Sequence, residues 1–291
     1  MKINKQRVLN EFYELIQIPC PSLQERVVAD ILKKRLEELG CTVTEDVESA
    51  KLLGGSAGNL VADLKGTVAG APAILLSAHM DCVNPCAGIK PCLENGVIRS
   101  DGTTILGGDD KGGIVAILET LRCLKEQNLP HGDIQVIFSV SEEQGCAGIK
   151  NLDTALLHAD MGFALDSSGR PGKIIYAAPG QNKIFAKIHG KTAHGGIAPE
   201  KGINAIKKAA EILINIVPDL VEVAMDCRSR NPEKLENLTD KIVTIFKQGG
   251  EKAEVPVDVE VRSSYKPYCL AKDSAVIELA AKTAKALQLP V

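Results

Sequence analysis

His79 and Asp81 follow the apolar run at residues 73–76, which predicts a buried strand. Polar residues at the end of a central strand are common positions for active sites in open α/β sheets. An imidazole nitrogen can bind a metal ion, and a nearby carboxylate can hold the ring in the correct tautomer. Because an isolated His-x-Asp pair is more often a hydrogen-bonded structural pair, its meaning depends on the acids that follow it.

Further acids lie near the ends of predicted strands: Asp109, Asp110, Glu142, Glu143 and Asp166. A cluster of like charges is unfavourable unless a cation neutralises it. Zn²⁺ accepts His and carboxylate ligands, and two-metal hydrolytic sites share a bridging ligand. Adjacent residues at a strand end point in different directions, so one of Glu142 and Glu143 can bind metal while the other acts as general base. The set favours a metal hydrolase; the alternatives are a Mg²⁺ or phosphate enzyme and a set of solvated loop acids.

Composition excludes several other classes. The 291 residues are 45% hydrophobic and 24% charged, which is typical of a globular chain long enough for two domains. The net charge of −3 and the 3% of aromatic residues disfavour nucleic acid and anionic membranes as partners. No apolar run has the length of a membrane span, and the start of the chain does not resemble a signal peptide. Nine cysteines without CxxC spacing indicate reduced thiols, so we expect a cytoplasmic protein.

Helices and strands alternate along the chain, and this predicts an α/β fold with a mixed sheet flanked by helices. In the first part, helices are expected over 8–16, 25–39 and 112–124, and strands over 59–64, 73–78, 133–140 and 161–165. After residue 179 the composition changes. Strands over 183–189, 220–226 and 255–262 and helices over 203–212 and 232–246 predict a smaller α/β domain. The expected domains are therefore 1–179 and 180–270, with a last helix, 274–287, in a segment 271–291 that returns to the first domain.

Four ordered motifs resemble the M20 family of co-catalytic zinc metallopeptidases, in particular its peptidase T (aminotripeptidase) branch. They are SAHMD at 77–81, GGDDKGG at 107–113, SEEQG at 141–145 and DS at 166–167. The segment DGTTILG at 101–107 strengthens the likeness to that branch. The resemblance implies a zinc-exopeptidase-like fold with an inserted lid and dimerisation domain, and hydrolysis of short peptides.

The resemblance also implies a role for each residue. His79 and Asp166 would bind one Zn²⁺, Glu143 the second, and Asp109 both, across a cis peptide to Asp110. Asp81 would orient His79. Glu142 would be the general base for a metal-bound hydroxide that attacks the peptide carbonyl.

In the second domain, the segment GKTAHGG at 190–196 resembles the lid motif of the family. Its histidine, His194, would stabilise the transition state in the partner subunit of a homodimer. Asn215 and Arg228 match positions that hold substrate, and an arginine fork suits a terminal carboxylate. A turn histidine and a surface salt bridge are the structural alternatives for His194 and Arg228.

The chain departs from the family at its C-terminal end. Relatives carry a later histidine that completes the second zinc site, but His194 is the last histidine of this sequence. The stretch before Asn215 is also shorter than in relatives. With Asp109 and Glu143 alone the second zinc would keep two protein ligands, fewer than zinc sites usually have. The sequence therefore predicts an incomplete second site, through lost segments or because the sequence is part of a longer protein.

Three functions remain open at this point. The first is a dizinc exopeptidase acting on short peptides, such as a tripeptidase. The second is a deacylase or carboxypeptidase with the same chemistry. The third is a catalytically silent relative that binds peptide or metal. A Mg²⁺-dependent phosphate enzyme is disfavoured because the glycines at 107–108 lack the Lys-Ser/Thr of a phosphate loop.

Overall fold

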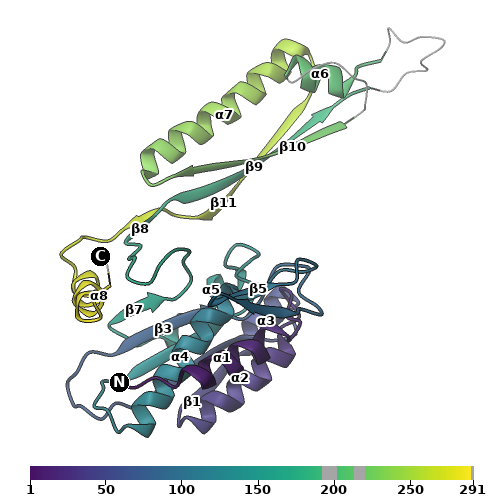
Figure 1. Ribbon diagram of the computed structural model, residues 1–291. Helices are drawn as coiled ribbons and strands as arrows, with labels where there is room; N and C mark the ends of the chain where they lie inside the picture. The colour runs from purple at the N-terminus through teal and green to yellow at the C-terminus, as the bar shows by residue number, and fades with distance from the viewer. Residues whose placement is uncertain (192–201, 213–219, 290–291) are drawn as a thin grey trace. The chain divides into compact units, whose positions relative to one another are not determined.

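The computed structural model describes residues 1–191, 202–212 and 220–289. The chain divides into two compact units, Met1–Gly169 and Arg170–Val291 (Figure 1). Each unit is described by itself. The boundary proposed at 179/180 and the assignment of residues 271–291 to the first domain stay predictions.

The first unit is built on a five-stranded mixed sheet with the order β1-β2-β6-β3-β7. The strands are β1 (Thr42–Asp46), β2 (Asn59–Leu64), β3 (Ile74–His79), β6 (Ile134–Ser139) and β7 (Met161–Ala164). β1 and β2 are antiparallel to their neighbours, whereas β6, β3 and β7 run parallel. A separate hairpin pairs β4 (Pro91–Glu94) with β5 (Val97–Ser100).

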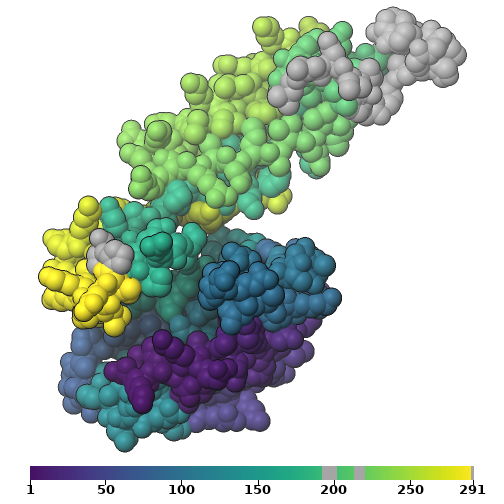
Figure 2. Space-filling model, in the orientation of Figure 1, coloured from purple at the N-terminus to yellow at the C-terminus, as the bar shows by residue number. Residues whose placement is uncertain are grey.

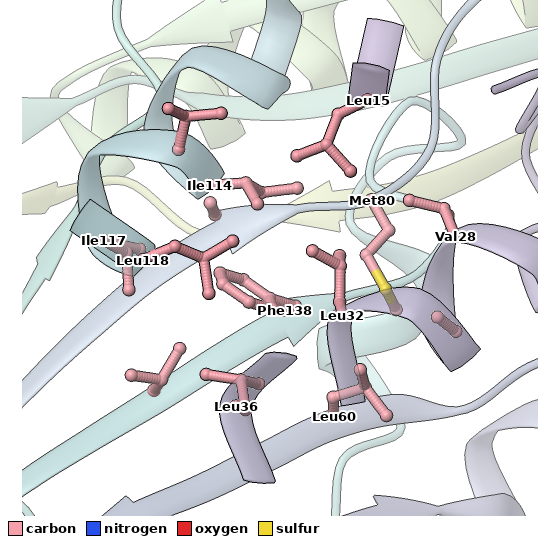
Figure 3. Packing of buried hydrophobic residues seen from close by; sticks show 14 of the residues in the cluster. Leu15, Val28, Leu32, Leu36, Leu60, Met80, Ile114, Ile117, Leu118 and Phe138 are labelled. Carbon is pink, nitrogen blue, oxygen red and sulfur yellow. The ribbon is translucent and has the colours of Figure 1, made fainter. Parts of the chain in front are cut away.

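Three helices cover one face of this sheet: α1 (Lys5–Ile16), α2 (Arg26–Glu38) and α4 (Gly108–Glu126). Their apolar stripes meet the sheet in one cluster, in which Phe138 of β6 packs among Leu32, Leu36, Ile117 and Leu118 (Figure 3). The N-terminal segment, purple in Figure 2, lies on the outside of this unit.

The opposite face of the sheet carries a smaller apolar cluster, in which Val61 and Ile137 pack with Leu152. Leu152 lies between two short elements, α5 (Ala147–Lys150) and the 3₁₀ helix η1 (Thr154–Leu156). α3 (Val47–Leu53) follows β1 and ends at Gly54, whose left-handed φ of 68° suits glycine. With both faces covered, all six residues of β6 are buried.

The second unit contains a three-stranded antiparallel sheet with the order β10-β9-β11. Its elements are β9 (Gly180–His189), α6 (Ala205–Glu211), β10 (Leu220–Ser229), α7 (Pro232–Ala253) and β11 (Val257–Tyr265). Alternate residues of β9, among them Ala186 and Ile188, pack with Phe246 of α7. The remaining elements are β8 (Ala177–Ala178), β12 (Tyr268–Cys269) and α8 (Ala275–Ala286).

The predicted class, a mixed sheet flanked by helices, is confirmed. The expected end of the helix at 246 is wrong, because α7 continues through Gly249 and Gly250 to Ala253. A Cβ on Gly250 would lie 2.5 Å from the side chain of Val257. Glycine there lets the helix lie close to β11 and does not end it.

Candidate metal centre

The parallel strands bring the candidate residues to one edge of the sheet. His79 at the end of β3 is paired with Ser139 at the end of β6, and Ser77 is paired with Ala164 at the end of β7. The acids that follow each strand therefore leave the sheet side by side. α4 packs against the same sheet and begins at Gly108, and Asp109 and Asp110 stand at its start, where the backbone departs from helical angles.

Two groups of three side chains at this edge have ligand atoms within 4.8 Å of one another. The first consists of His79, Glu142 and Asp166, and the second of His79, Asp109 and Glu143. The five residues expected from the sequence as metal ligands or general base are thus together. Their division into two zinc sites stays a prediction, since Glu142 groups with His79 and Asp166 as closely as a ligand would.

Asp81 is the centre of the hydrogen bonding below this cluster. Its Oδ1 accepts from the Glu142 backbone N–H at 2.9 Å, and its Oδ2 accepts from the Glu143 backbone N–H at 3.2 Å. His79 Nδ1 lies 3.0 Å from the Asp81 carbonyl oxygen and 3.3 Å from Oδ1. Asp81 thus turns Nε2 of His79 toward Asp109, whose Oδ1 is 3.2 Å away, and fixes the backbone that carries both glutamates.

The electrostatics fit a cation. Burial lowers the pKa of His79, but its hydrogen bond to Asp81 and the charges of Asp81, Asp166 and Asp110 outweigh this and raise that pKa to about 9. Burial and the nearby acids also raise the pKa values of Glu143 and Asp166, despite the opposing effect of His79. Without a metal, the excess of carboxylates thus favours the protonated forms of these groups. A bound divalent cation would instead neutralise the carboxylate charges.

Asp110 is more buried than Asp109 and the acids Glu142, Glu143 and Asp166. Its Oδ1 accepts from the Gly113 backbone N–H at 3.0 Å, while Oδ2 is buried without a partner among the described residues. Burial raises the pKa of Asp110 to about 7, against the effect of His79 and with that of Asp166 and Asp109. A Cβ on residue 113 would lie 2.4 Å from Asp110 Oδ1, so glycine is required for this approach. The peptide between Asp109 and Asp110 is cis, as the resemblance implied.

The remaining predicted residues belong to the second unit. His194 and Asn215 lie outside the described residues. Arg228 stands on β10, where its Nη2 lies 3.2 Å from Asp226 Oδ2. This surface salt bridge is the structural alternative to a contact between Arg228 and substrate. The role of Arg228 toward substrate stays a prediction. Of the other histidines described, His131 contacts Gly132, His158 contacts Gln135 and Asp63, and His189 contacts Asp258.

Sequence reasoning missed four residues that contact the site from outside. Ser22 Oγ donates to Asp81 Oδ2 at 2.6 Å, and Cys146 Sγ donates to Glu142 Oε1 at 3.2 Å. Glu25 and Ser141 hydrogen-bond to each other next to Glu142. Ser22 and Glu25 are 59 and 116 residues from their partners, so no local pattern could reveal them. Only Ser141 had a signal, its position directly before the glutamate pair.

Comparison with known proteins agrees with this geometry. The model of Peptidase family M20/M25/M40 matches residues 75–291. The aminopeptidase PepT of Bacillus cereus ATCC 10987 is 39% identical with a TM-score of 0.88, covering 99% of this chain and 83% of its own. A tripeptidase (SAV1512) of Staphylococcus aureus subsp. aureus Mu50 is 37% identical with a TM-score of 0.92 and the same coverage.

A protein of Bacillus subtilis (strain 168) called uncharacterized protein YqjE is 38% identical over 312 residues, which is 99% of this chain and 84% of that protein. The family match begins at the strand that ends in His79 and includes every candidate ligand. This chain therefore belongs to Peptidase family M20/M25/M40 and is a hydrolase with the fold of the PepT peptidases.

Proposed function

We propose that this chain is a metal-dependent exopeptidase that hydrolyses short peptides, such as tripeptides. The observation that carries the proposal is the convergence of Glu142 with His79, Asp109, Glu143 and Asp166 at one edge of the sheet. Similarity to an aminopeptidase and a tripeptidase supports short peptides as the substrate class.

In the proposed site His79, Asp109, Glu143 and Asp166 hold one or two divalent cations, with Zn²⁺ the ion that imidazole and carboxylate donors suit. Such a cation polarises a carbonyl oxygen and makes a water molecule acidic. Glu142 then takes a proton from the attacking water and passes it to the leaving amine. Asp81 holds Glu142 in place through its backbone N–H, and Cys146 donates to one of its carboxylate oxygens.

Replacing Glu142 tests the proposal. Glu142→Gln keeps the size of the side chain and removes the proton acceptor, so kcat on tripeptides should fall by about 10²–10⁴-fold. Glu48→Gln is the matched control, because Glu48 is exposed and pairs with Lys51 on the surface. Activity is measured by release of a free N-terminal residue, and metal content by elemental analysis. Activity of Glu142→Gln close to that of the unchanged protein would refute the general-base assignment.

A substrate panel separates the exopeptidase from the alternatives. Tripeptides with a free amine should be cleaved, while N-acyl amino acids and N-terminally blocked peptides should not. Preferred cleavage of N-acyl amino acids would instead identify a deacylase. No turnover in protein that contains metal would identify a silent relative.

The resemblance also supports two further proposals, a homodimer through the second unit and a cytoplasmic location. Light scattering measures the mass in solution, and a mass of 31.0 kDa would contradict the homodimer.

The cytoplasmic location is supported by the cysteines. All nine are free, which suits a reducing compartment. Fractionation of cells with an antibody tests it. None of the helices in the described ranges combines the length and apolarity needed to cross a bilayer.

A further inference from the structure

Glu25 is a buried acid outside the metal cluster, and none of its side chain is exposed. It immediately precedes α2, yet its carboxylate does not cap that helix. A charged side chain is costly to bury unless it is hydrogen-bonded, so its contacts indicate what it does there.

One carboxylate oxygen of Glu25 joins two loops. Oε1 accepts from the backbone N–H of Leu23 at 3.0 Å, from the backbone N–H of Ser141 at 3.0 Å and from Ser141 Oγ at 3.2 Å. The Leu23 N–H also points at Ser141 Oγ, 3.2 Å away. The loop before α2 is thus bound to the loop after β6 through a single acceptor.

Both loops are held in an unusual backbone conformation at this point. Leu23 has a φ of 72° and Ser141 a φ of 50°. Residues other than glycine adopt such left-handed values at an energetic cost and keep them where the surroundings impose them. The two N–H groups that bind Glu25 thus both belong to residues with positive φ; in the loop after β6, Gly145 and Cys146 have positive φ as well.

The conformation of Ser141 decides where the next two residues point. Glu142 and Glu143 follow directly, and their N–H groups reach the two oxygens of Asp81. Ser22, in the same loop as Leu23, donates to Asp81 Oδ2 at 2.6 Å. The loop before α2 therefore supports the Glu142–Glu143 backbone from one side through Glu25 and from the other through Asp81.

We propose that Glu25 is a positioning residue for catalysis, which holds Ser141 in its left-handed conformation and so aims Glu142 and Glu143 at the metal centre. The proposal rests on the proposed function. The proposal goes beyond that function by assigning a role in the reaction to a side chain outside both candidate ligand groups.

Three variants test the proposal on tripeptides. Glu25→Ala removes the shared acceptor, so kcat should fall about 100-fold while KM stays within about threefold, because groups around the ligands typically contribute 10–100-fold. Glu25→Gln keeps an oxygen at Oε1 and should lose less than about tenfold. Glu11→Gln is the matched control: Glu11 is also buried, but it pairs with Arg35 and Arg122. It should lose stability and keep kcat and KM.

Metal affinity provides a readout that does not depend on turnover. Chelator competition should show about 10–100-fold weaker metal binding in Glu25→Ala, because Glu143 is no longer held, and no change in Glu11→Gln. If the unchanged protein does not cleave peptides, the proposed function fails, and metal affinity alone then decides the role of Glu25.

Two results would overturn the role of Glu25. One is folded Glu25→Ala with kcat and metal affinity within twofold of the unchanged protein. The other is an equal loss of kcat in Glu11→Gln, which would mean that lost stability is the cause. If Glu25→Ala does not fold, Ser141→Ala decides instead, since it removes the Oγ contact to Glu25. It should lower kcat about tenfold at constant KM, and unchanged kcat would refute the proposal.

Discussion

Lys111, which follows Asp109 and Asp110 in the sequence, is fully buried. Its Nζ donates to the Met80 carbonyl oxygen at 2.5 Å and to Cys82 Sγ at 3.2 Å. A hydrogen bond from Cys20 and the Lys111 ammonium, against the effect of burial, hold the pKa of the Cys82 thiol below its usual range. Lys111 thus ties the first turn of α4 to the end of β3, the two segments that carry Asp109 and His79.

Replacing this lysine should destabilise the first unit. Lys111→Met keeps the length of the side chain and leaves the Met80 carbonyl without its donor, so the free energy of unfolding should fall by about 1–3 kcal/mol. Urea unfolding measures the change. Lys65→Met, which removes an exposed lysine paired with Asp133, is the control and should change stability by less than about 1 kcal/mol. Equal effects of the two substitutions would contradict a supporting role for Lys111.

At the same scale, the sequence indicated the side chains that converge at the edge of the sheet, but not the residues that support them. His79, Asp81, Asp109, Glu142, Glu143 and Asp166 could be named because acids at strand ends form a recognisable pattern. Glu25 could not, because an acid at the start of a helix is ordinary and its function depends on a contact with Ser141. A single sequence contains no signal for such a contact.

Among the elements, Arg26 at the start of α2 binds Glu45 of β1 through two hydrogen bonds of 2.7 and 3.2 Å. The Gly58 backbone N–H, just before β2, donates to the same carboxylate at 3.0 Å. Burial opposes ionisation of Glu45, but the Arg26 and Gly58 hydrogen bonds outweigh it and lower its pKa below the ordinary 4.5. One carboxylate thus joins a helix, an edge strand and the segment before β2.

This contact should make stability depend on pH in a defined window. Because the pKa of Glu45 is lowered in the folded state, its contribution is fully present above about pH 4.5 and is lost as the pH falls through the lower folded value. Glu45→Gln should therefore cost about 1 kcal/mol at pH 7, since Arg26 is partly exposed, and progressively less below pH 4.5. Urea unfolding at pH 7, 5 and 3.5 measures this. A difference that grows on acidification would refute it.

Strong periodicity made most elements predictable, and weak periodicity explains the omissions. The strand expected at 59–64 has the bounds of β2, and those at 73–78, 133–140 and 161–165 correspond to β3, β6 and β7 within a residue or two at each end. β1 was missed because its sequence, TVTED, offers one apolar residue on an edge strand. The start of α7 was predictable from Asn231, which accepts from the Lys234 N–H, and from the proline that follows it.

At the scale of the whole molecule, the carboxylates of the candidate metal centre belong to one of the two compact units. All candidate ligands lie within Met1–Gly169. A cation that binds only the folded site stabilises that unit by about 2.7 kcal/mol at a hundredfold excess over its Kd. Removing the metal should therefore lower the stability of this unit alone.

Calorimetry with Zn²⁺ and with a chelator tests this expectation. The unfolding transition of the first unit should move up with metal by about 2–4 °C for each kcal/mol, and any separate transition of the second unit should stay in place. Glu143→Gln should reduce the shift, and Glu48→Gln should not. Intrinsic fluorescence would report mainly on the second unit. The chain has no tryptophan, and three of its four tyrosines lie in that unit. An equal shift with and without Glu143 would contradict the assigned ligand.

β6 also has a consequence for motion. It lies between β2 and β3, and all six of its residues are buried. Amide hydrogens in such a strand exchange with water only when the sheet itself comes apart, whereas loops open far more often. The backbone of Ser141, Glu142 and Glu143, bound to Glu25 and Asp81, is therefore anchored next to the part of this unit that opens least often.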